Sequence, residues 1–144
     1  MSVRAAGVDE ELEAAPFVWP VRVYYEDTDS AGIVYYASYL RFLERARTEW
    51  LRSRGFEHRA LAREFAVVFT VSRLGIEYLR PARLDDRLEV TVAVARRGGA
   101  SITLRQEVRQ EDGERLCRAD VRIACVDAER LRPCAIPRAI SSEL

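Results

Sequence analysis

Lysine is absent from this sequence of 144 residues, histidine occurs once, at His58, and cysteine occurs only three times. All 23 basic residues are arginines, and 23 acidic residues balance them to a formal net charge of zero. A chain without net positive charge has no global field that attracts nucleic acid. One histidine and three cysteines without metal-ligand spacing do not supply a zinc site. We therefore expect no nucleic-acid partner and no bound metal.

Long apolar stretches are also missing. The longest runs comprise a few residues, whereas a helix that spans a bilayer needs about 20, and 32% of the residues are charged. Residues 1–16, MSVRAAGVDEELEAAP, are acidic and lack the apolar centre of a signal peptide. We expect them to form a disordered N-terminal tail, followed by one domain over residues 17–144. We expect a cytoplasmic protein with reduced thiols.

A strand, a polar turn and a long helix are predicted at the start of this domain. Apolar and polar residues alternate over residues 21–26, which is typical of a strand with two distinct faces. The apolar face would carry Val21, Val23 and Tyr25. Turn-forming residues occupy positions 27–32. Over residues 36–54 apolar side chains recur at helical spacing, and Gly55 is typical of the residue that follows a helix. A short helix over residues 57–64 is expected next.

Residues 66–125 alternate between apolar and polar with a period of two, which predicts four strands. Turn-forming segments at 81–86, 98–99 and 111–113 separate these strands. Because the connections are tight, we predict an antiparallel meander with one apolar face. That face needs cover, and the 36–54 helix is the long apolar-striped helix available. The predicted fold is therefore α+β, with a five-stranded antiparallel sheet wrapped around a long central helix.

The strongest candidate for a catalytic site lies where the first strand meets the helix. Glu26, Asp27 and Asp29 fall within four residues, on a turn that precedes a helix N-terminus. Unpaired N–H groups at such a terminus stabilise a nearby carboxylate and can hydrogen-bond an oxygen that gains negative charge. A carboxylate and an oxyanion site are the minimum equipment for hydrolysing an activated ester. Alternatively, the acids only cap the helix and shape an Asx turn.

Residues 21–39, VRVYYEDTDSAGIVYYASY, resemble the 4-hydroxybenzoyl-CoA thioesterase family, and most closely its branch of Tol–Pal-associated acyl-CoA thioesterases. Further similarities are Glu44-Arg-Ala-Arg47, Val67-Val-Phe69, residues 77–86 (EYLRPARLDD) and Cys125-Val-Asp127. The resemblance runs from Trp19 to Ile140. It implies the hot-dog fold, in agreement with the predicted order of elements. It also implies metal-independent hydrolysis of coenzyme A thioesters to free acid and CoA, with no cofactor other than the CoA of the substrate.

The resemblance also assigns roles within the motif. The aspartate after threonine, Asp29, is the catalytic carboxylate, either as nucleophile or as general base on water. The backbone N–H of Tyr36 polarises the thioester carbonyl, and Gly32 and Val34 belong to the substrate-binding part of the motif. Members of the Tol–Pal branch often carry histidine at the position of Tyr36, so this chain lacks that side chain.

Arg96 and Arg97 precede the turn at residues 98–99. Guanidinium groups recognise phosphate well, and the resemblance places a basic residue at Arg97 near the CoA nucleotide. We predict that this pair binds CoA phosphates, and a solvated basic turn is the alternative. His58 is expected on the surface, and Cys117 and Cys125 in the core.

Two other functions are compatible with this fold. The first is a non-catalytic module that binds acyl-CoA or an acyl carrier protein, with a link to the cell-envelope machinery; such a binder does not need Asp29. The second is a hydratase acting on enoyl thioesters, which generally relies on an Asp/His pair, but His58 lies outside the motif. The family pairs two sheets and places its active site at the subunit boundary, so we expect a homodimer or a dimer of dimers.

Overall fold

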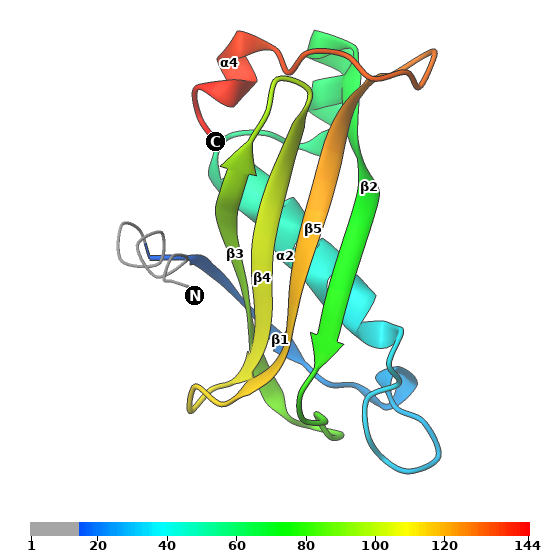
Figure 1. Cartoon of the computed structure of the whole chain (residues 1–144). Helices are drawn as coiled ribbons and strands as arrows, with labels where there is room; N and C mark the ends of the chain where they lie inside the picture. The colour runs from blue at the N-terminus through cyan, green and yellow to red at the C-terminus, as the bar shows by residue number, and fades with distance from the viewer. Residues whose placement is uncertain (1–14) are drawn as a thin grey trace.

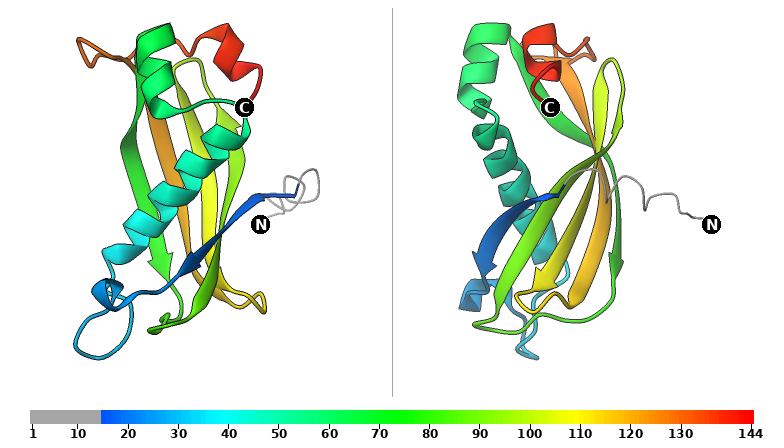
Figure 2. Two further views of the ribbon diagram at one scale, coloured as in Figure 1. Left: turned by 180° about the vertical axis from the view of Figure 1, so that it is seen from behind. Right: turned by 90° about the vertical axis from the view of Figure 1, so that its left-hand side faces the viewer.

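The computed structural model describes residues 15–144. The predicted tail, residues 1–16, lies almost wholly outside the described residues, so its disorder stays a prediction. A strongly curved antiparallel sheet wraps around one long helix (Figure 1; Figure 2). The predicted α+β hot-dog architecture is therefore confirmed. None of the helices within residues 15–144 is long and apolar enough to cross a membrane.

The elements follow one another in nearly the predicted order. They are β1 (Phe17–Arg22), the 3-10 turn η1 (Tyr25–Asp27), α2 (Ser38–Ser53), α3 (His58–Ala60), the π-helical turn η2 (Leu61–Phe65), β2 (Val67–Tyr78), β3 (Arg87–Arg97), β4 (Ser101–Gln110), β5 (Arg115–Asp127) and α4 (Arg138–Ser141). The short helix predicted over residues 57–64 is present as α3 and η2. The first strand ends earlier than predicted: Val21 and Val23 are buried as expected, but Tyr25 lies in η1 and is 83% exposed.

The sheet has the strand order β1-β3-β4-β5-β2, so the prediction of a four-stranded meander is wrong for β2. Strands β3, β4 and β5 are joined as hairpins, but β2 pairs with β5 at the far edge. Alternating apolar residues indicate which face of a strand is buried, but not which strand lies beside it. Residues 81–86, predicted as a simple turn, therefore belong to a crossover over residues 79–86 that runs from one edge of the sheet to β3.

Helix α2 packs its apolar stripe against the inner face of the sheet. Tyr39, Leu43, Ala46 and Trp50 are all buried, as the helical spacing predicted. At its end, the N–H of Phe56 donates to the Leu51 carbonyl (2.9 Å) and the N–H of Gly55 donates to the Arg52 carbonyl (2.9 Å). These two bonds define a Schellman motif, which needs the positive φ of 95° that Gly55 adopts.

A polar contact anchors α2 to the middle of the sheet. Gln106, on the inner face of β4, is fully buried. Its Nε2 donates to the carbonyls of Leu43 (3.1 Å) and Thr91 (3.3 Å), and its Oε1 accepts from the Arg47 guanidinium (3.1 Å). Burial lowers the pKa of Arg47. One amide therefore connects the helix, β3 and β4, in a core that is otherwise mostly apolar.

Candidate active site

Residues 28–37 form the loop between η1 and α2, and this loop carries the acidic motif. Thr28 and Val34 pair as an isolated antiparallel bridge. Between them, the N–H of Asp29 donates to the Ile33 carbonyl (2.9 Å), and the N–H of Gly32 donates to the Asp29 carbonyl (3.0 Å). Gly32 has φ = 78°, a left-handed conformation that glycine adopts without strain. The backbone therefore closes a tight turn with Asp29 at its beginning.

The Asp29 carboxylate is exposed on this turn. Its Oδ1 accepts the N–H of Ala31 (2.9 Å), which is the Asx-type contact that the sequence left as an alternative. Its Oδ2 makes no hydrogen bond with any residue from 15 to 144. One oxygen thus orients the side chain, while the other stays free to meet a substrate or a water molecule.

Asp27, by contrast, is buried and held by contacts within the chain. It is only 2% exposed, and its Oδ2 accepts the N–H of Tyr24 (2.8 Å). Its backbone carbonyl accepts the N–H of Tyr35 (2.9 Å), and its Oδ1 lies 3.9 Å from the guanidinium of Arg41. These contacts bend the chain after β1 and hold the two ends of the loop together, which explains why Tyr25 leaves the strand.

The start of α2 carries free hydrogen-bond donors. The N–H of Ser38 donates to the Tyr35 carbonyl (2.8 Å) and that of Leu40 to the Ala37 carbonyl (3.1 Å). Within the described chain, the N–H groups of Tyr36 and Ala37 have no acceptor. These unpaired groups are the donors that the sequence predicted at the helix start. The Tyr36 side chain itself is 62% exposed.

Tyr78, at the end of β2, was missed as a site residue by sequence reasoning. Its hydroxyl donates to the Tyr36 carbonyl (2.8 Å), and its ring lies edge-on to the rings of Tyr36 (6.4 Å between centroids) and Tyr39 (5.4 Å). Burial raises the pKa of Tyr78, which favours the protonated hydroxyl that donates in this contact. The contact fixes the peptide group between Tyr36 and Ala37. A clue was present, because Tyr78 belongs to the 77–86 segment of the family resemblance.

The crossover from β2 to β3 supports the loop from the other side. The N–H of Val34 donates to the Ala82 carbonyl (2.9 Å), and the N–H of Leu84 approaches the Gly32 carbonyl (3.4 Å). The N–H of Ala82 in turn donates to the Tyr39 hydroxyl (3.1 Å). The Val34 side chain is buried in the core, whereas Gly32 is exposed beside Asp29.

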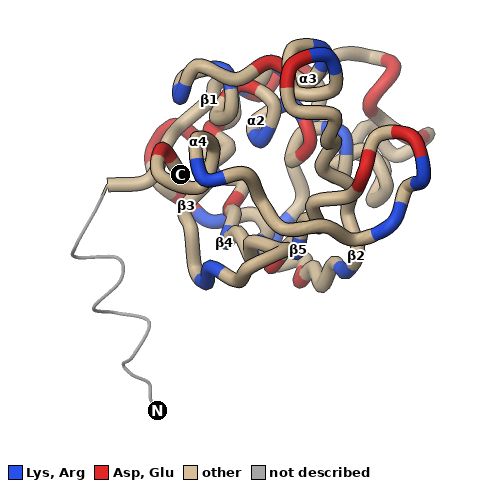
Figure 3. Tube along the Cα trace, turned by 90° about the horizontal axis from the view of Figure 1, so that it is seen from above, with Lys and Arg blue, Asp and Glu red and all other residues tan. Residues whose placement is uncertain are grey.

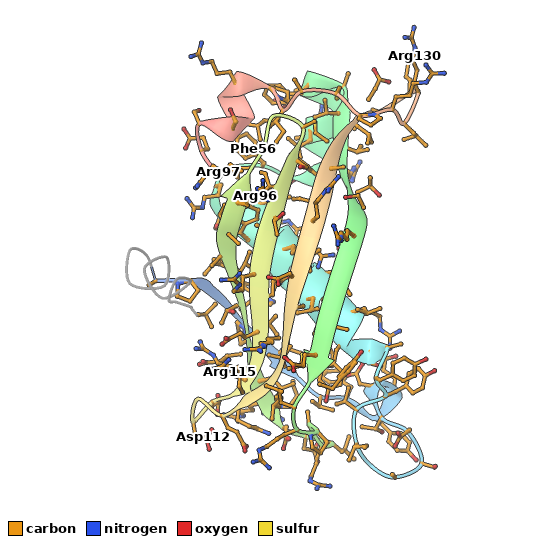
Figure 4. The ribbon with its side chains drawn as sticks, in the orientation of Figure 1. Phe56, Arg96, Arg97, Asp112, Arg115 and Arg130 are labelled. Atoms are coloured by element: carbon orange, nitrogen blue, oxygen red, sulfur yellow. The ribbon has the colours of Figure 1, made fainter. Side chains whose placement is uncertain are left out.

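Arg96 and Arg97 lie at the other end of the molecule from this loop (Figure 4). Arg96 and Arg97 follow each other in β3 and so point to opposite faces, and the β-bulge between Val94 and Arg96 makes Arg96 the outward one. Arg97 faces inward, and its guanidinium donates to the backbone oxygen of Leu144 (2.7 Å). Arg96 faces outward and is exposed. Within one chain, the structure therefore does not bring the predicted phosphate-binding pair together with Asp29.

The remaining reactive side chains lie outside the loop. His58 is exposed, with its Nε2 3.2 Å from the Thr48 hydroxyl. Cys117 and Cys125 are buried as predicted, and burial raises the pKa of each thiol to about 12, so neither is a thiolate at neutral pH. Residues 15–144 contain no group of three or more His, Cys, Asp or Glu side chains positioned to hold a metal ion.

Comparison with known proteins identifies the family. The model of the Thioesterase superfamily matches residues 31–117, more than half of the chain. The chain belongs to this superfamily. It is 46% identical over 127 residues to the acyl-CoA thioester hydrolase YbgC of Escherichia coli, which covers 88% of this chain and 94% of that protein.

Solved structures of thioesterases share the fold. A probable thioesterase from Bartonella henselae is 35% identical, with a TM-score of 0.81 over 85% of this chain and 100% of that one. A 4-hydroxybenzoyl-CoA thioesterase solved with 4-hydroxybenzoyl-CoA superposes with a TM-score of 0.83 over 90% of this chain and 99% of that one. At 24% identity, this second match bears on the fold alone. The resemblance found in the sequence is therefore confirmed at the level of the family.

Proposed function

We propose that this protein hydrolyses acyl-CoA thioesters to a free carboxylic acid and CoA, with Asp29 as the catalytic carboxylate and the start of α2 as the oxyanion site. That the chain is an acyl-CoA thioesterase follows from its family and from its 46% identity to an acyl-CoA thioester hydrolase over nearly the whole of that protein. The roles of individual residues rest on the geometry of the loop.

Asp29 can act in two ways. As a general base it takes a proton from water, the water oxygen attacks the carbonyl carbon, and the C–S bond breaks to release CoA, whose sulfur takes up the proton. As a nucleophile its free oxygen attacks the carbonyl carbon and expels the CoA thiolate, which leaves a mixed anhydride that water hydrolyses. Both routes place negative charge on the carbonyl oxygen, and neither step requires a metal ion.

The oxyanion donors are the N–H group of Tyr36 and, beside it, that of Ala37. Such donors stabilise the transition state best when they need no reorganisation as the charge develops. The hydrogen bond from Tyr78 to the Tyr36 carbonyl supports this role, because it fixes the peptide group that carries the Ala37 N–H. The observation that carries the proposal is the presence, on one braced loop, of an exposed carboxylate with a free oxygen and of two unpaired N–H groups.

The purified protein should release free thiol from acyl-CoA substrates, measured across a panel of acyl chain lengths. Because the proposed chemistry uses no metal, dialysis against EDTA should leave the rate unchanged. A matching CoA thioether, which has no cleavable acyl bond, provides the control. Binding of acyl-CoA without thiol release from any member of the panel would favour the non-catalytic binding module. Hydration of an enoyl-CoA would favour the hydratase. The Asp/His pair on which such enzymes generally rely is not present in the loop, since His58 lies outside it and contacts Thr48.

Replacing Tyr36 with phenylalanine tests whether the backbone or the side chain acts at the helix start. Phenylalanine keeps both the N–H donor and the ring, so kcat should fall by less than about tenfold, or 1.4 kcal/mol of barrier. The measurement is kcat on the best substrate of the panel. A loss of kcat as large as that of an Asp29 variant would mean that the Tyr36 hydroxyl has the catalytic role of the histidine that is common at this position in the Tol–Pal branch.

Assembly is a further part of the proposal. Strand β2 is a sheet edge of 12 residues, and it exposes 44% of Val71. A long edge with free backbone groups invites pairing with another strand. We expect a homodimer or a dimer of dimers, measurable by light scattering at working concentration. A monodisperse monomer would contradict this expectation. A cytoplasmic location and a link to an acyl carrier protein or to the cell envelope remain proposals.

A further inference from the structure

The outer face of the sheet, which points away from α2, carries three arginines in one row. Arg73 on β2 lies opposite Arg122 on β5, Arg122 lies opposite Thr103 on β4, and Thr103 lies opposite Arg96 on β3. Residues paired across neighbouring strands project from the same face, so these four side chains form a continuous line. We call it the arginine row. The three arginines are exposed.

Two β-bulges place the ends of this row. One lies between Val71 and Arg73, the other between Val94 and Arg96. Without the second bulge, Arg96 would continue the inward alternation that ends at Val94. Bulges re-aim side chains, and they are common beside functional sites. Here both bulges direct an arginine to the same level of the same face.

The arginine row has no compensating acid. Among residues 15–144, no ion pair involves Arg73, Arg96 or Arg122. Like charges directly opposite each other in a sheet are unfavourable, which applies to Arg73 and Arg122. Four other arginines of this face have acidic partners, whereas Arg22 and Arg87, opposite each other on β1 and β3, form no ion pair within residues 15–144. The four pairs are Arg105–Asp120 (3.3 Å), Arg109–Glu89 (3.8 Å), Arg115–Glu107 (3.5 Å) and Arg118–Glu77 (2.8 Å).

We propose that the arginine row is a binding site for a compact phosphate-bearing ligand of the nucleotide class. Guanidinium groups on adjacent strands lie close enough to bracket one phosphate, and Arg96, about 10 Å from Arg122 at two strand spacings, can hold a second. Beside the row, a hollow of about 450 Å³ opens where Gly75 contributes no side chain. That size suits the organic part of a small ligand.

The surrounding charges exclude a flat polyanion. Glu77, Glu107 and Asp120 lie on the same face as the arginine row, one or two residue pairs further along. In the view from above, basic and acidic positions are interspersed along the described part of the chain (Figure 3). A lipid surface or a nucleic-acid duplex would meet these acids, whereas a phosphate group that reaches only the row would not. This inference is independent of the proposed hydrolysis, because it concerns binding alone.

The test is direct binding, by calorimetry, of inorganic pyrophosphate and of adenosine 3′,5′-bisphosphate to the whole protein. Both should bind, and the double variant Arg73→Gln/Arg122→Gln should weaken binding at least about tenfold, because two charge-assisted contacts are lost. The double variant Arg22→Gln/Arg87→Gln removes the same charge from the same face, outside the hollow, and should change affinity less than about twofold. No binding to the wild type, or equal losses in the two variants, would overturn the proposal.

Two further measurements complete the experiment. Without ligand, the Arg73→Gln/Arg122→Gln variant should unfold at the same temperature as the wild type or higher, since a repulsion is removed. A lower unfolding temperature would mean that the arginines support the fold and would count against the proposal. The KM of the Arg73→Gln/Arg122→Gln variant for acyl-CoA distinguishes the two sources of phosphate. A KM above that of the wild type, at unchanged kcat, identifies the nucleotide of the substrate itself as the ligand. An unchanged KM identifies a separate nucleotide, and either result supports the site.

Discussion

Replacing Asp29 with asparagine should lower kcat by at least about a hundredfold, a lower bound for removing a general base and less than the loss expected for a nucleophile. Asparagine preserves the shape of the side chain and can still accept the Ala31 N–H through its amide oxygen, so the turn should persist. What it removes is the charge needed for attack or for proton abstraction. The measurement is thiol release under saturating acyl-CoA, with thermal unfolding of both proteins as the check on folding.

Asp27→Asn is the matched control from the same turn. The buried Asp27 holds the Tyr24 N–H, and the asparagine oxygen can replace that acceptor without a change in volume. Its kcat should therefore remain within about tenfold of the wild type, close to that of Tyr36→Phe. If Asp29→Asn keeps near-full activity while it is folded, the mechanism proposed for Asp29 is wrong. If Asp27→Asn alone abolishes activity at unchanged stability, the catalytic carboxylate has been misassigned.

Replacing Gln106 with methionine should lower the free energy of unfolding by about 2–4 kcal/mol, because a hydrogen bond to a charged group is lost and the group is left without a partner. Methionine fills a similar volume but offers no acceptor to the half-buried Arg47 guanidinium. Its thioether also cannot donate to the Leu43 and Thr91 carbonyls. Urea unfolding followed by circular dichroism provides the measurement.

A second substitution sharpens this prediction. Arg47→Met added to Gln106→Met removes the charge that was left unpaired, so the double variant should be more stable than Gln106→Met alone. Gln110→Met, also on β4, is the control. Gln110 donates to Asp86 from a less buried position, and its replacement should cost less than about 1 kcal/mol. A double variant that is less stable than Gln106→Met would show that the Arg47 stem contributes more through packing than its charge costs.

The local elements were largely predictable because each rests on short-range patterns. Helix α2 came within two residues of the predicted bounds, since one apolar stripe and one glycine define it. The buried faces of β4 and β5 follow the alternation read from the sequence, including the two cysteines. Gln106 is a polar exception on this buried face. The alternation predicted its position, but it did not indicate that the Arg47 guanidinium donates a hydrogen bond to it.

The candidate site was predictable in outline and not in detail. The motif located the acidic turn and the helix start, and Asp29 was chosen by resemblance. The different surroundings of Asp27 and Asp29 could not be predicted from the sequence, because they depend on three-dimensional contacts and the two carboxylates are only two residues apart. Burial of Asp27 and exposure of Asp29 support the different roles proposed for them. Tyr78 reaches Tyr36 across 42 positions of the chain, a contact that no local pattern encodes.

By itself the sequence determined the kinds of elements, their order, their buried faces and the family, because periodicity and a dense motif are properties of neighbouring residues. Only the tertiary structure decided that β2 lies beside β5 and that residues 79–86 brace the loop of residues 28–37. It also decided that Arg96 points outward and Arg97 inward, so that Arg96 aligns with Arg122 and Arg73. These outcomes depend on strand register and on bulges, where one extra residue reverses every side chain that follows. Register is set by the packing of the whole sheet on α2, so residues distant in the chain decide it together.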